Sequence, residues 1–292
     1  MRTLALCVSL LAVSPSVAPA APLDPLRVLV TNDDGVKAPG IDALVQALSA
    51  NPNVQVTVIV PATNQSGTGD GFTVTPITVS PSSTAGAFPA TAVTGKPADT
   101  VLFGVLHALP QRPDLVVSGI NFGQNASVEL VNISGTVGAG LTAARLGIPA
   151  IAVSHGQFTQ AAQFGEAANY VAGLVERFRQ SRGFRAKMST RSGARSALVL
   201  NVNFPTCSSG STRGEVLVPL GHLNQVTGYT GSAPTFTPTV VSVSPFTADC
   251  TSSVMNPATD VDALANGFAT LTVLNPDLTA SPKMRGFRFL VR

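Results

Sequence analysis

The stretch Arg27-Val28-Leu29-Val30-Thr31-Asn32-Asp33-Asp34-Gly35 decides the fold class. Its first five residues form a short β-rich run that ends at a polar turn, which predicts a buried strand at 27–31. Pro39-Gly40 then opens an amphipathic helical pattern, and residues 54–60 form a second apolar strand pattern. A strand, a helix and a strand in this order predict a parallel sheet with a right-handed crossover.

The same alternation continues along the chain as far as residue 202. A polar region at 64–89, with strand-like pieces near 72–79, and a loop at 119–131 interrupt it. The further helices are expected at 97–109, 134–147 and 160–179, and the further strands at 114–118, 149–154, 197–202, 215–219, 239–243 and 268–274. The sequence therefore predicts an α/β core over residues 21–185. A looser, β-rich C-terminal part over 186–292 adds a late core strand and an oligomerisation arm.

The composition excludes several classes of protein. The 292 residues are 45% hydrophobic and only 11% charged, against about 25% charged in an average domain, which excludes a disordered chain. Beyond residue 30 no apolar run approaches the ~20 residues of a membrane-spanning helix, so we expect no membrane anchor. The net charge is only +3, the Lys and Arg residues form no cluster, and the sequence has no tryptophan. We therefore do not expect a nucleic-acid duplex as a partner.

The first 20 residues have the pattern of a secretory signal peptide. A positive start at Arg2, an apolar run and the small-residue site Ala18-Pro19-Ala20 follow in order. The alternative is a first buried strand or helix. We expect an exported protein, periplasmic or secreted, that retains Cys207 and Cys250, either as one disulfide or as two free thiols.

Polar side chains gather where the predicted strands end. Asn32, Asp33 and Asp34 follow the first strand, Gln65-Ser66-Gly67 the second, and Asn121 the strand at 114–118. Ligand sites of parallel α/β sheets lie at this edge. Carboxylate, hydroxyl and amide oxygens suit Mg²⁺, Mn²⁺ or Ca²⁺, and no His/Cys spacing for zinc is present.

Ser134-Gly135-Thr136 opens a small-residue helix. Free backbone N–H groups, the helix dipole and two hydroxyls would bind an anion there. Taken alone, Ser134 is a simple helix cap and Asp-Asp-Gly a simple turn. Arriving together at successive strand ends, the two motifs favour phosphoester chemistry.

Several long motifs of the chain resemble the survival protein SurE family of nucleotidases. They are, in chain order, Val30-Thr31-Asn32-Asp33-Asp34-Gly35, Ala38-Pro39-Gly40-Ile41, Gln65-Ser66-Gly67, Gly95-Lys96-Pro97-Ala98-Asp99, residues 113–121 with Gly123 and Asn125, Ser134-Gly135-Thr136-Val137, residues 200–205 and residues 260–279. The resemblance covers roughly 27–279.

The resemblance implies a Rossmann-like three-layer α/β/α core and a metal-dependent phosphatase acting on nucleoside 5′-monophosphates, or 3′-monophosphates. One divalent cation per subunit would bind to Asp33, Asp34, Ser66 and Asn121. Asp33 and Asp34 would be catalytic, and Asn32, Ser134, Gly135 and Thr136 would border the phosphate. The C-terminal part of the family often exchanges between subunits, so we expect a homodimer or homotetramer with an arm near 235–246; the alternative is a long surface hairpin.

The chain departs from the family where Gly-Asp-Asp and a Tyr usually precede Ser-Gly-Thr. It reads Ala126-Ser127-Val128-Glu129-Leu130-Val131-Asn132-Ile133, in which Glu129 is a weak substitute for those aspartates. The loop at 67–95 also differs.

The three histidines are poor candidates for a catalytic nucleophile. His107 reads as a packed or rim residue, and His155 and His222 are candidates for substrate contact and proton donation. The motifs of serine hydrolases and P-loop NTPases are missing. Two alternatives to a nucleotidase stay open: a broad exported acid phosphatase, and a non-catalytic metal- or nucleotide-binding protein.

Overall fold

One nine-stranded sheet organises the chain. The computed structural model describes residues 24–156, 164–189, 196–207, 209–223, 226–240 and 247–276. The strand order in the sheet is β3-β4-β2-β1-β5-β6-β7-β13-β9. The strands are β1 (Leu26–Thr31), β2 (Val54–Pro61), β3 (Val79–Ser83), β4 (Pro89–Val93), β5 (Leu115–Phe122), β6 (Ala150–His155), β7 (Val199–Asn203), β9 (Glu215–Leu217) and β13 (Ala269–Leu274).

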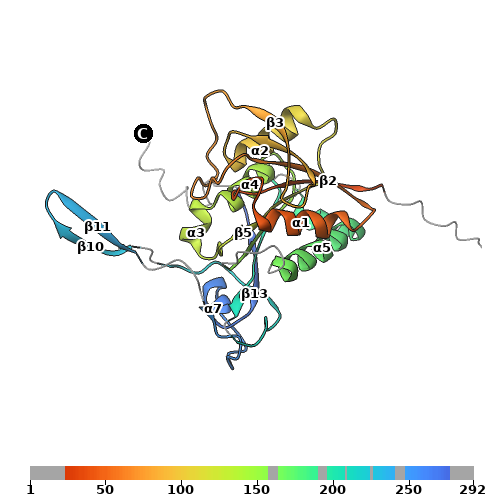
Figure 1. The fold of residues 1–292 in the computed structure, drawn as a ribbon. Helices are drawn as coiled ribbons and strands as arrows, with labels where there is room; N and C mark the ends of the chain where they lie inside the picture. Colours follow the sequence, from red (N-terminus) through yellow and green to blue (C-terminus); the bar gives the residue numbers. More distant parts are fainter. Residues whose placement is uncertain are drawn as a thin grey trace, which may run out of the picture.

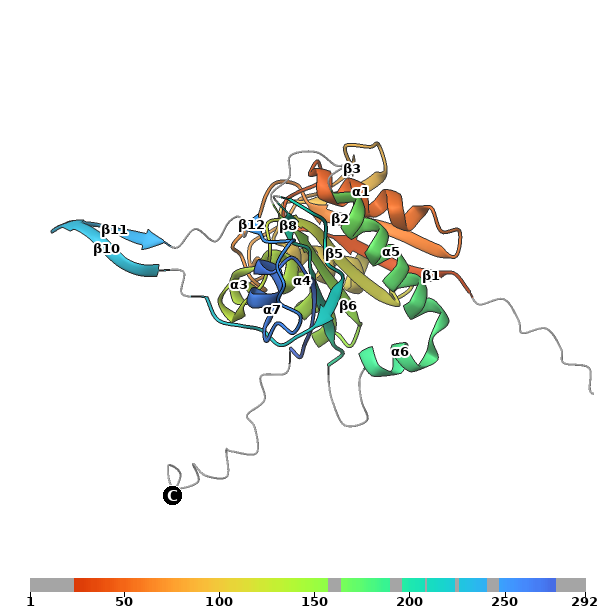
Figure 2. The same ribbon diagram turned by 90° about the horizontal axis from the view of Figure 1, so that it is seen from below.

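Helices cover both faces of this sheet, which confirms the predicted three-layer α/β/α core (Figures 1 and 2). One face packs against α1 and α5 and the other against α2 and α4. The helical segments are α1 (Pro39–Ser49), α2 (Pro97–Phe103) with its π-helical extension η1 (Gly104–Ala108), α3 (Val128–Ile133), α4 (Gly135–Arg145), α5 (Gly165–Gln180), α6 (Arg182–Met188) and α7 (Asp260–Ala265). None of the described helices is long and apolar enough to cross a membrane.

The central strands β4, β2, β1, β5, β6 and β7 all run parallel. Their carboxyl ends therefore share one edge of the sheet. The register places Val30 beside both Val58 of β2 and Val117 of β5. The apolar residues of β1 and those of β5 up to Ile120 are buried on both faces, which explains the continuous hydrophobic runs in the sequence.

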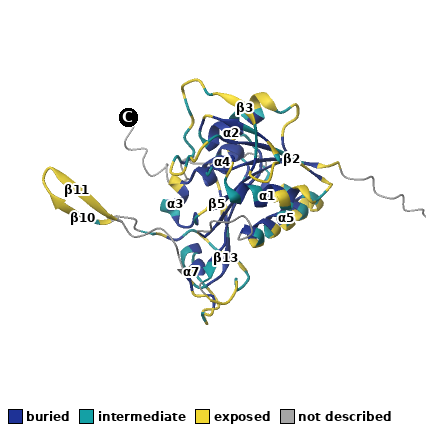
Figure 3. Cartoon of the chain, in the orientation of Figure 1, coloured by how far each residue is buried: buried dark blue, intermediate teal, exposed yellow. Residues whose placement is uncertain are grey.

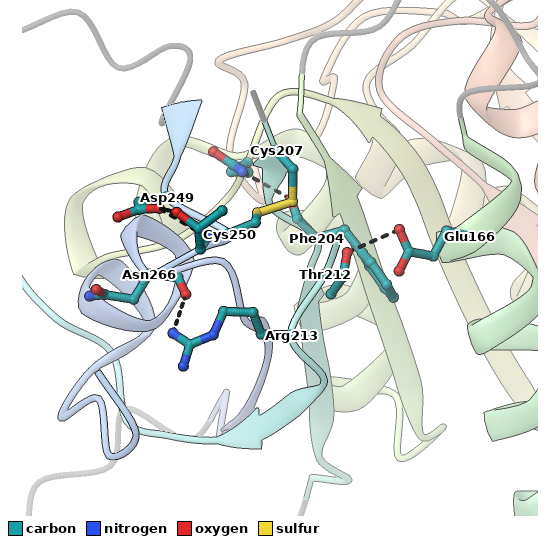
Figure 4. Close-up of a disulfide and its surroundings, with 10 residues drawn as sticks. Glu166, Phe204, Cys207, Thr212, Arg213, Asp249, Cys250 and Asn266 are labelled. Atoms are coloured by element: carbon teal, nitrogen blue, oxygen red, sulfur yellow. Dashed lines mark hydrogen bonds between the residues drawn. A yellow bond between two sulfur atoms is a disulfide. The ribbon is translucent and has the colours of Figure 1, made fainter. Parts of the chain in front are cut away.

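The C-terminal part joins the same sheet. Strand β13 pairs antiparallel with β7 and parallel with β9. Two further short strands, β8 (Thr206–Cys207) and β12 (Thr247–Ala248), pair next to a disulfide between Cys207 and Cys250 (Figure 4). The bond joins residues 43 positions apart, a span for which loop closure stabilises the fold by about 4 kcal/mol in the chain-entropy model.

A hairpin of β10 (Val226–Ser232) and β11 (Thr235–Val240) projects from the body of the molecule (Figures 1 and 2). Its described residues are largely exposed (Figure 3). Tyr229 and Phe236 are among them. The arm was expected at 235–246, of which residues 241–246 lie outside the described part of the chain.

The structure differs from the predicted elements in several places: α6 and α7 were not predicted, the strand expected at 239–243 is β11 from Thr235, and two segments near the site change. The strand-like piece expected at 72–79 is replaced by the antiparallel pair β3 and β4, the second of which begins at Pro89. Within the expected loop 119–131, β5 continues to Phe122 and α3 begins at Val128. Helix α3 starts there because the hydroxyl of Ser127 accepts a hydrogen bond from the backbone N–H of Leu130 (3.3 Å).

Candidate active site

The turn after β1 is built by Asn32. Its side-chain amide donates to the carbonyl of Gly35 (2.9 Å) and accepts from the N–H of Gly35 (3.3 Å), and the residue is fully buried. Gly35 adopts φ +98°, a conformation that a residue with a side chain rarely reaches. Asn32 was expected to border the phosphate; in the structure its amide closes the turn that presents the two aspartates, with one of its two amide protons donated to Gly35.

Asp33 lies at the N-terminus of α4. It is only 2% exposed, and one carboxylate oxygen accepts a hydrogen bond from the hydroxyl of Thr136 (2.5 Å). Gly135 permits this approach, because a Cβ there would come within 2.8 Å of the Cβ of Asp33. Burial raises the pKa of Asp33, although hydrogen bonds from Thr136 and from the backbone of Gly135 oppose the rise.

Asp34 reaches the surface beside Asp33. One of its oxygens accepts the backbone N–H of Phe122 (2.9 Å) and the other accepts the side-chain amide of Asn64 (3.3 Å). Burial and the charge of Asp33 raise the pKa of Asp34 to about 7, with the Phe122 hydrogen bond opposing the rise. The charge of Asp33 therefore contributes to destabilising the ionised form of Asp34.

The loop after β2 is tied to both aspartates. The N–H of Gln65 donates to the carbonyl of Asp33 (2.7 Å), and Asn64, which holds Asp34, also accepts the N–H of Ser66 (2.9 Å). The loop continues over α4, where a Cβ on Gly138 would lie 2.1 Å from the carbonyl oxygen of Gly69. The small residues at the start of α4 thus let this loop approach closely.

Asn121, at the end of β5, completes the set of predicted ligands. Its amide nitrogen donates to the carbonyl of Gly123 (2.7 Å). The side-chain oxygen takes no part in that hydrogen bond and would be the atom that binds a cation. Its neighbour Phe122 contacts Asp34, so β5 ends at the aspartate pair. The structure therefore brings Asp33, Asp34, the Ser66 loop and Asn121 to one edge of the sheet.

This donor set fits a hard divalent cation. All its ligand atoms are oxygens, as Mg²⁺, Mn²⁺ and Ca²⁺ require. A cation would also relieve the repulsion between Asp33 and Asp34, which contributes to the raised pKa of Asp34. Among the described residues no group of three or more His, Cys, Asp or Glu side chains could hold a metal, so amide and hydroxyl oxygens would have to complete the site.

Ser134 is the N-cap of α4. Its hydroxyl accepts the N–H of Val137 (3.1 Å), as the simple capping interpretation of the motif expects. The first turn of α4, with Gly135 and Thr136, faces Asp33. The predicted phosphate-binding motif and the predicted metal ligands are therefore adjacent.

Asp260 is a positioning residue that sequence reasoning did not assign. It is fully buried and accepts the N–H groups of Ser127 (2.9 Å) and Gly221 (2.7 Å), so it ties the start of α3 to the C-terminal part. A sequence signal was present, because Thr259 caps the helix that Asp260 begins and accepts the N–H of Asp262.

Glu129 and His222 form a pair on the surface. The carboxylate of Glu129 lies 2.9 Å from the Nδ1 atom of His222 and accepts the N–H of Leu223 (2.8 Å). The hydrogen bond with His222 contributes most to lowering the pKa of Glu129 to about 2. The candidate proton donor is thus paired with the residue that replaces the aspartates of the family.

The other two histidines lie elsewhere. His155 is buried at the end of β6, where its ring stacks on Phe204 with centroids 5.5 Å apart. Burial lowers the pKa of His155 to about 4, which keeps the ring neutral at pH 7. The ring of His107, in η1, packs against Phe103, as the interpretation of a packed or rim residue expects.

The raised pKa of Asp34 predicts a pH-dependent stability of the metal-free protein. Ionised Asp34 is disfavoured in the fold, so we expect the melting temperature to fall as pH rises from about 4 through 7. Asp34→Asn removes this charge and should raise the melting temperature at pH 8 by a few degrees. Thermal unfolding of wild type and variant across pH measures both effects.

Asp114→Asn is the matched control with the opposite sign. Burial raises the pKa of Asp114, but hydrogen bonds from Arg27 outweigh burial and hold the pKa below its ordinary value. The same substitution there should lower the melting temperature at pH 8. If both variants shift stability in the same direction, the assignment of charge repulsion to Asp34 is wrong.

Comparison with known proteins gives the same fold and motifs. The family model described as survival protein SurE matches residues 28–226. The 5′-nucleotidase SurE of Syntrophobacter fumaroxidans is 35% identical over 255 residues, covering 87% of this chain and 95% of the relative. That of Methanopyrus kandleri is 41% identical over 181 residues, covering 62% and 66%. The crystal structure of the SurE protein from Aquifex aeolicus aligns with a TM-score of 0.69 at 28% identity, covering 91% of this chain and all of that one. The resemblance seen in the motifs is confirmed, and the chain belongs to the SurE family.

Proposed function

We propose that this SurE-family enzyme is a metal-dependent phosphomonoesterase that hydrolyses nucleoside 5′-monophosphates, and also 3′-monophosphates, to nucleoside and phosphate. The observation that carries the proposal is the pair Asp33 and Asp34 at the N-terminus of α4. Curated relatives with high coverage of the chain are 5′-nucleotidases, which supports the same substrate class.

Asp33, Asp34, Ser66 and Asn121 would hold one divalent cation, Mg²⁺, Mn²⁺ or Ca²⁺. When bound, such a cation neutralises charge on the phosphoryl group and lowers the pKa of a water molecule. Ser134, Gly135 and Thr136 would border the phosphate at the start of α4. The hydroxyl of Ser134, which accepts the N–H of Val137, would donate its own proton to a phosphoryl oxygen, whereas the hydroxyl proton of Thr136 is donated to Asp33.

The contacts of the two aspartates divide their roles. Asp33 is buried and fixed by Thr136, so it positions the site. Asp34 is more exposed, and we assign to it the acceptance of the proton from the attacking water.

Asp33→Asn should abolish metal binding and hydrolysis together, with a loss of about 100-fold or more in kcat/KM, because it removes a carboxylate from the cation and from the phosphoryl site. Phosphate release from nucleoside monophosphates with Mg²⁺ or Mn²⁺, with and without chelator, measures activity; calorimetric titration measures metal binding. Asp24→Asn, an exposed carboxylate before β1, is the matched control.

The same assay, run also on an aryl phosphate, distinguishes the nucleotidase from the two alternative functions. Equal hydrolysis of an aryl phosphate and of nucleotides identifies a broad acid phosphatase. No metal-dependent phosphate release by the pure wild-type protein contradicts the proposal and leaves a non-catalytic binding protein. Full activity of Asp33→Asn overturns the assigned site.

We further propose that the protein is a homodimer or homotetramer in which the β10–β11 hairpin contacts a neighbouring subunit. A two-stranded hairpin is marginally stable alone in water, yet this one projects from the body (Figure 3). Tyr229 and Phe236 on it are exposed. Both observations favour a partner surface that covers these rings.

Replacing residues 226–240 with a short Gly-Ser linker should convert the oligomer to a monomer, because the apolar contacts of the arm are removed. Size-exclusion chromatography with light scattering measures the mass. An oligomer of unchanged mass in the deletion variant contradicts the assignment of the hairpin as the arm.

We also propose that the protein is exported, to the periplasm or the medium. The signal-like pattern of residues 1–20 supports this, and so does the Cys207–Cys250 disulfide, which is typical of oxidising compartments.

Expression of the full chain in a Gram-negative host should yield a periplasmic or secreted protein that begins near residue 21, because the signal peptide is removed on export. Intact-mass spectrometry before and after alkylation shows the N-terminus and the oxidised Cys207–Cys250 pair. A cytoplasmic, full-length, reduced protein is the contrary result.

A further inference from the structure

Phe122 is an exposed ring attached to the aspartate pair. It ends β5, whose seven preceding residues are buried, yet Phe122 itself is 41% exposed. Its backbone N–H donates to Asp34 (2.9 Å), which fixes its position. An aromatic side chain therefore meets solvent within one residue of the site that would hold the phosphoryl group.

Aromatic residues end the two strands that follow β5 in the sheet. Phe122 and His155 are cross-strand partners in the β5–β6 pairing, so their side chains leave the same face of the sheet. The ring of His155 stacks on Phe204, which directly follows β7, and Phe204 contacts Tyr170 edge-on at 5.5 Å. His155 and Phe204 are buried and Tyr170 is half-buried, whereas Phe122 is exposed to solvent.

At the end of β5, polar side chains lie on the α2 and α4 side of the sheet and aromatic side chains lie on the α5 side. Asn121 and Phe122 are consecutive, so their side chains point to opposite faces. Thr31 and Asp33, on the polar side, contact Thr100 of α2 and Thr136 of α4, whereas Phe204 and His155 pack on the α5 side. The backbone N–H of Phe122 bonds to Asp34, so this exposed aromatic residue is one hydrogen bond from the aspartate pair, at the boundary between the two sides.

We propose that Phe122 is the specificity-determining platform on which the base of a nucleoside monophosphate stacks. This inference rests on the proposed nucleotidase function. Stacking on an aromatic ring tolerates every base, because every base has a π-face, and it increases with ring area. The enzyme should therefore accept all common bases, favour purines, and act poorly on phosphomonoesters without a planar group.

Steady-state kinetics on adenosine 5′-monophosphate and ribose 5-phosphate tests the platform. Both substrates carry the same phosphate ester, and only the first has a base. In Phe122→Ala the ratio of their kcat/KM values should fall roughly tenfold, mainly through the KM of the nucleotide. Phe122→Trp should preserve the ratio. Leu106→Ala is the control: Leu106 is 70% exposed in η1, which leads to Leu109 near Arg27 at the opposite end of the sheet.

Two kinetic results would overturn the inference. An unchanged ratio in Phe122→Ala means that the base does not contact the ring. An equal loss of activity on both substrates means that Phe122 acts only by shaping the end of β5.

A binding measurement separates this inference from the proposed activity. The natural chain has no tryptophan, so Phe122→Trp introduces a single fluorescent reporter. Titration with adenosine or adenosine 5′-monophosphate should quench that fluorescence, whereas Leu106→Trp should show no specific quenching. If quenching occurs without hydrolysis by the wild type, the activity proposal fails and the platform stands. If the indole of the Phe122→Trp variant is not quenched, the platform fails whatever the activity.

Discussion

The hydrogen bond between Asp33 and Thr136 is the contact on which the site depends. Removing a carboxylate from water is costly unless donors replace its hydration, and Asp33 is almost fully buried. Thr136 and the backbone at the start of α4 supply those donors, which fixes the end of β1 against the end of a helix 103 residues later. Asp34 is the next residue, so it lies partly buried beside the carboxylate of Asp33. Its burial and the charge of Asp33 together raise the pKa of Asp34. The fold therefore places two carboxylates side by side, where either protonation of Asp34 or a bound cation would relieve their repulsion.

Much of this arrangement was predictable because it is encoded locally. The apolar runs of β1, β2 and β5, each ended by polar residues, predict parallel strands whose ends meet, and Pro39 marks the start of α1. The use of Asn32 was not predictable from its position, because an amide that closes a turn and an amide that binds phosphate have the same sequence context. The structure shows the first of these uses, because the amide of Asn32 bonds to Gly35.

The missed elements depend on partners far away in sequence. Helix α3 has six residues, too few to be stable by propensity. It forms because Asp260, 133 residues away, holds the N–H of Ser127, and because residues 222 and 223 hold Glu129. Strand β4 begins with a proline and shows little hydrophobic alternation, so its pairing with β2 is set by the sheet rather than by its own sequence.

These long-range contacts make the C-terminal part a structural support of the site. The N–H of Ser134 bonds to the carbonyl of Leu130, so α3 leads directly into the cap of α4. Contacts from Asp260 and from residues 221–223 fix α3, and α4 in turn holds Asp33. Residue 223 also lies just before the β10–β11 hairpin. The aspartate pair is therefore held from the C-terminal part, through hydrogen bonds that lead from Asp260 and residues 221–223 to α3 and from α3 to the cap of α4.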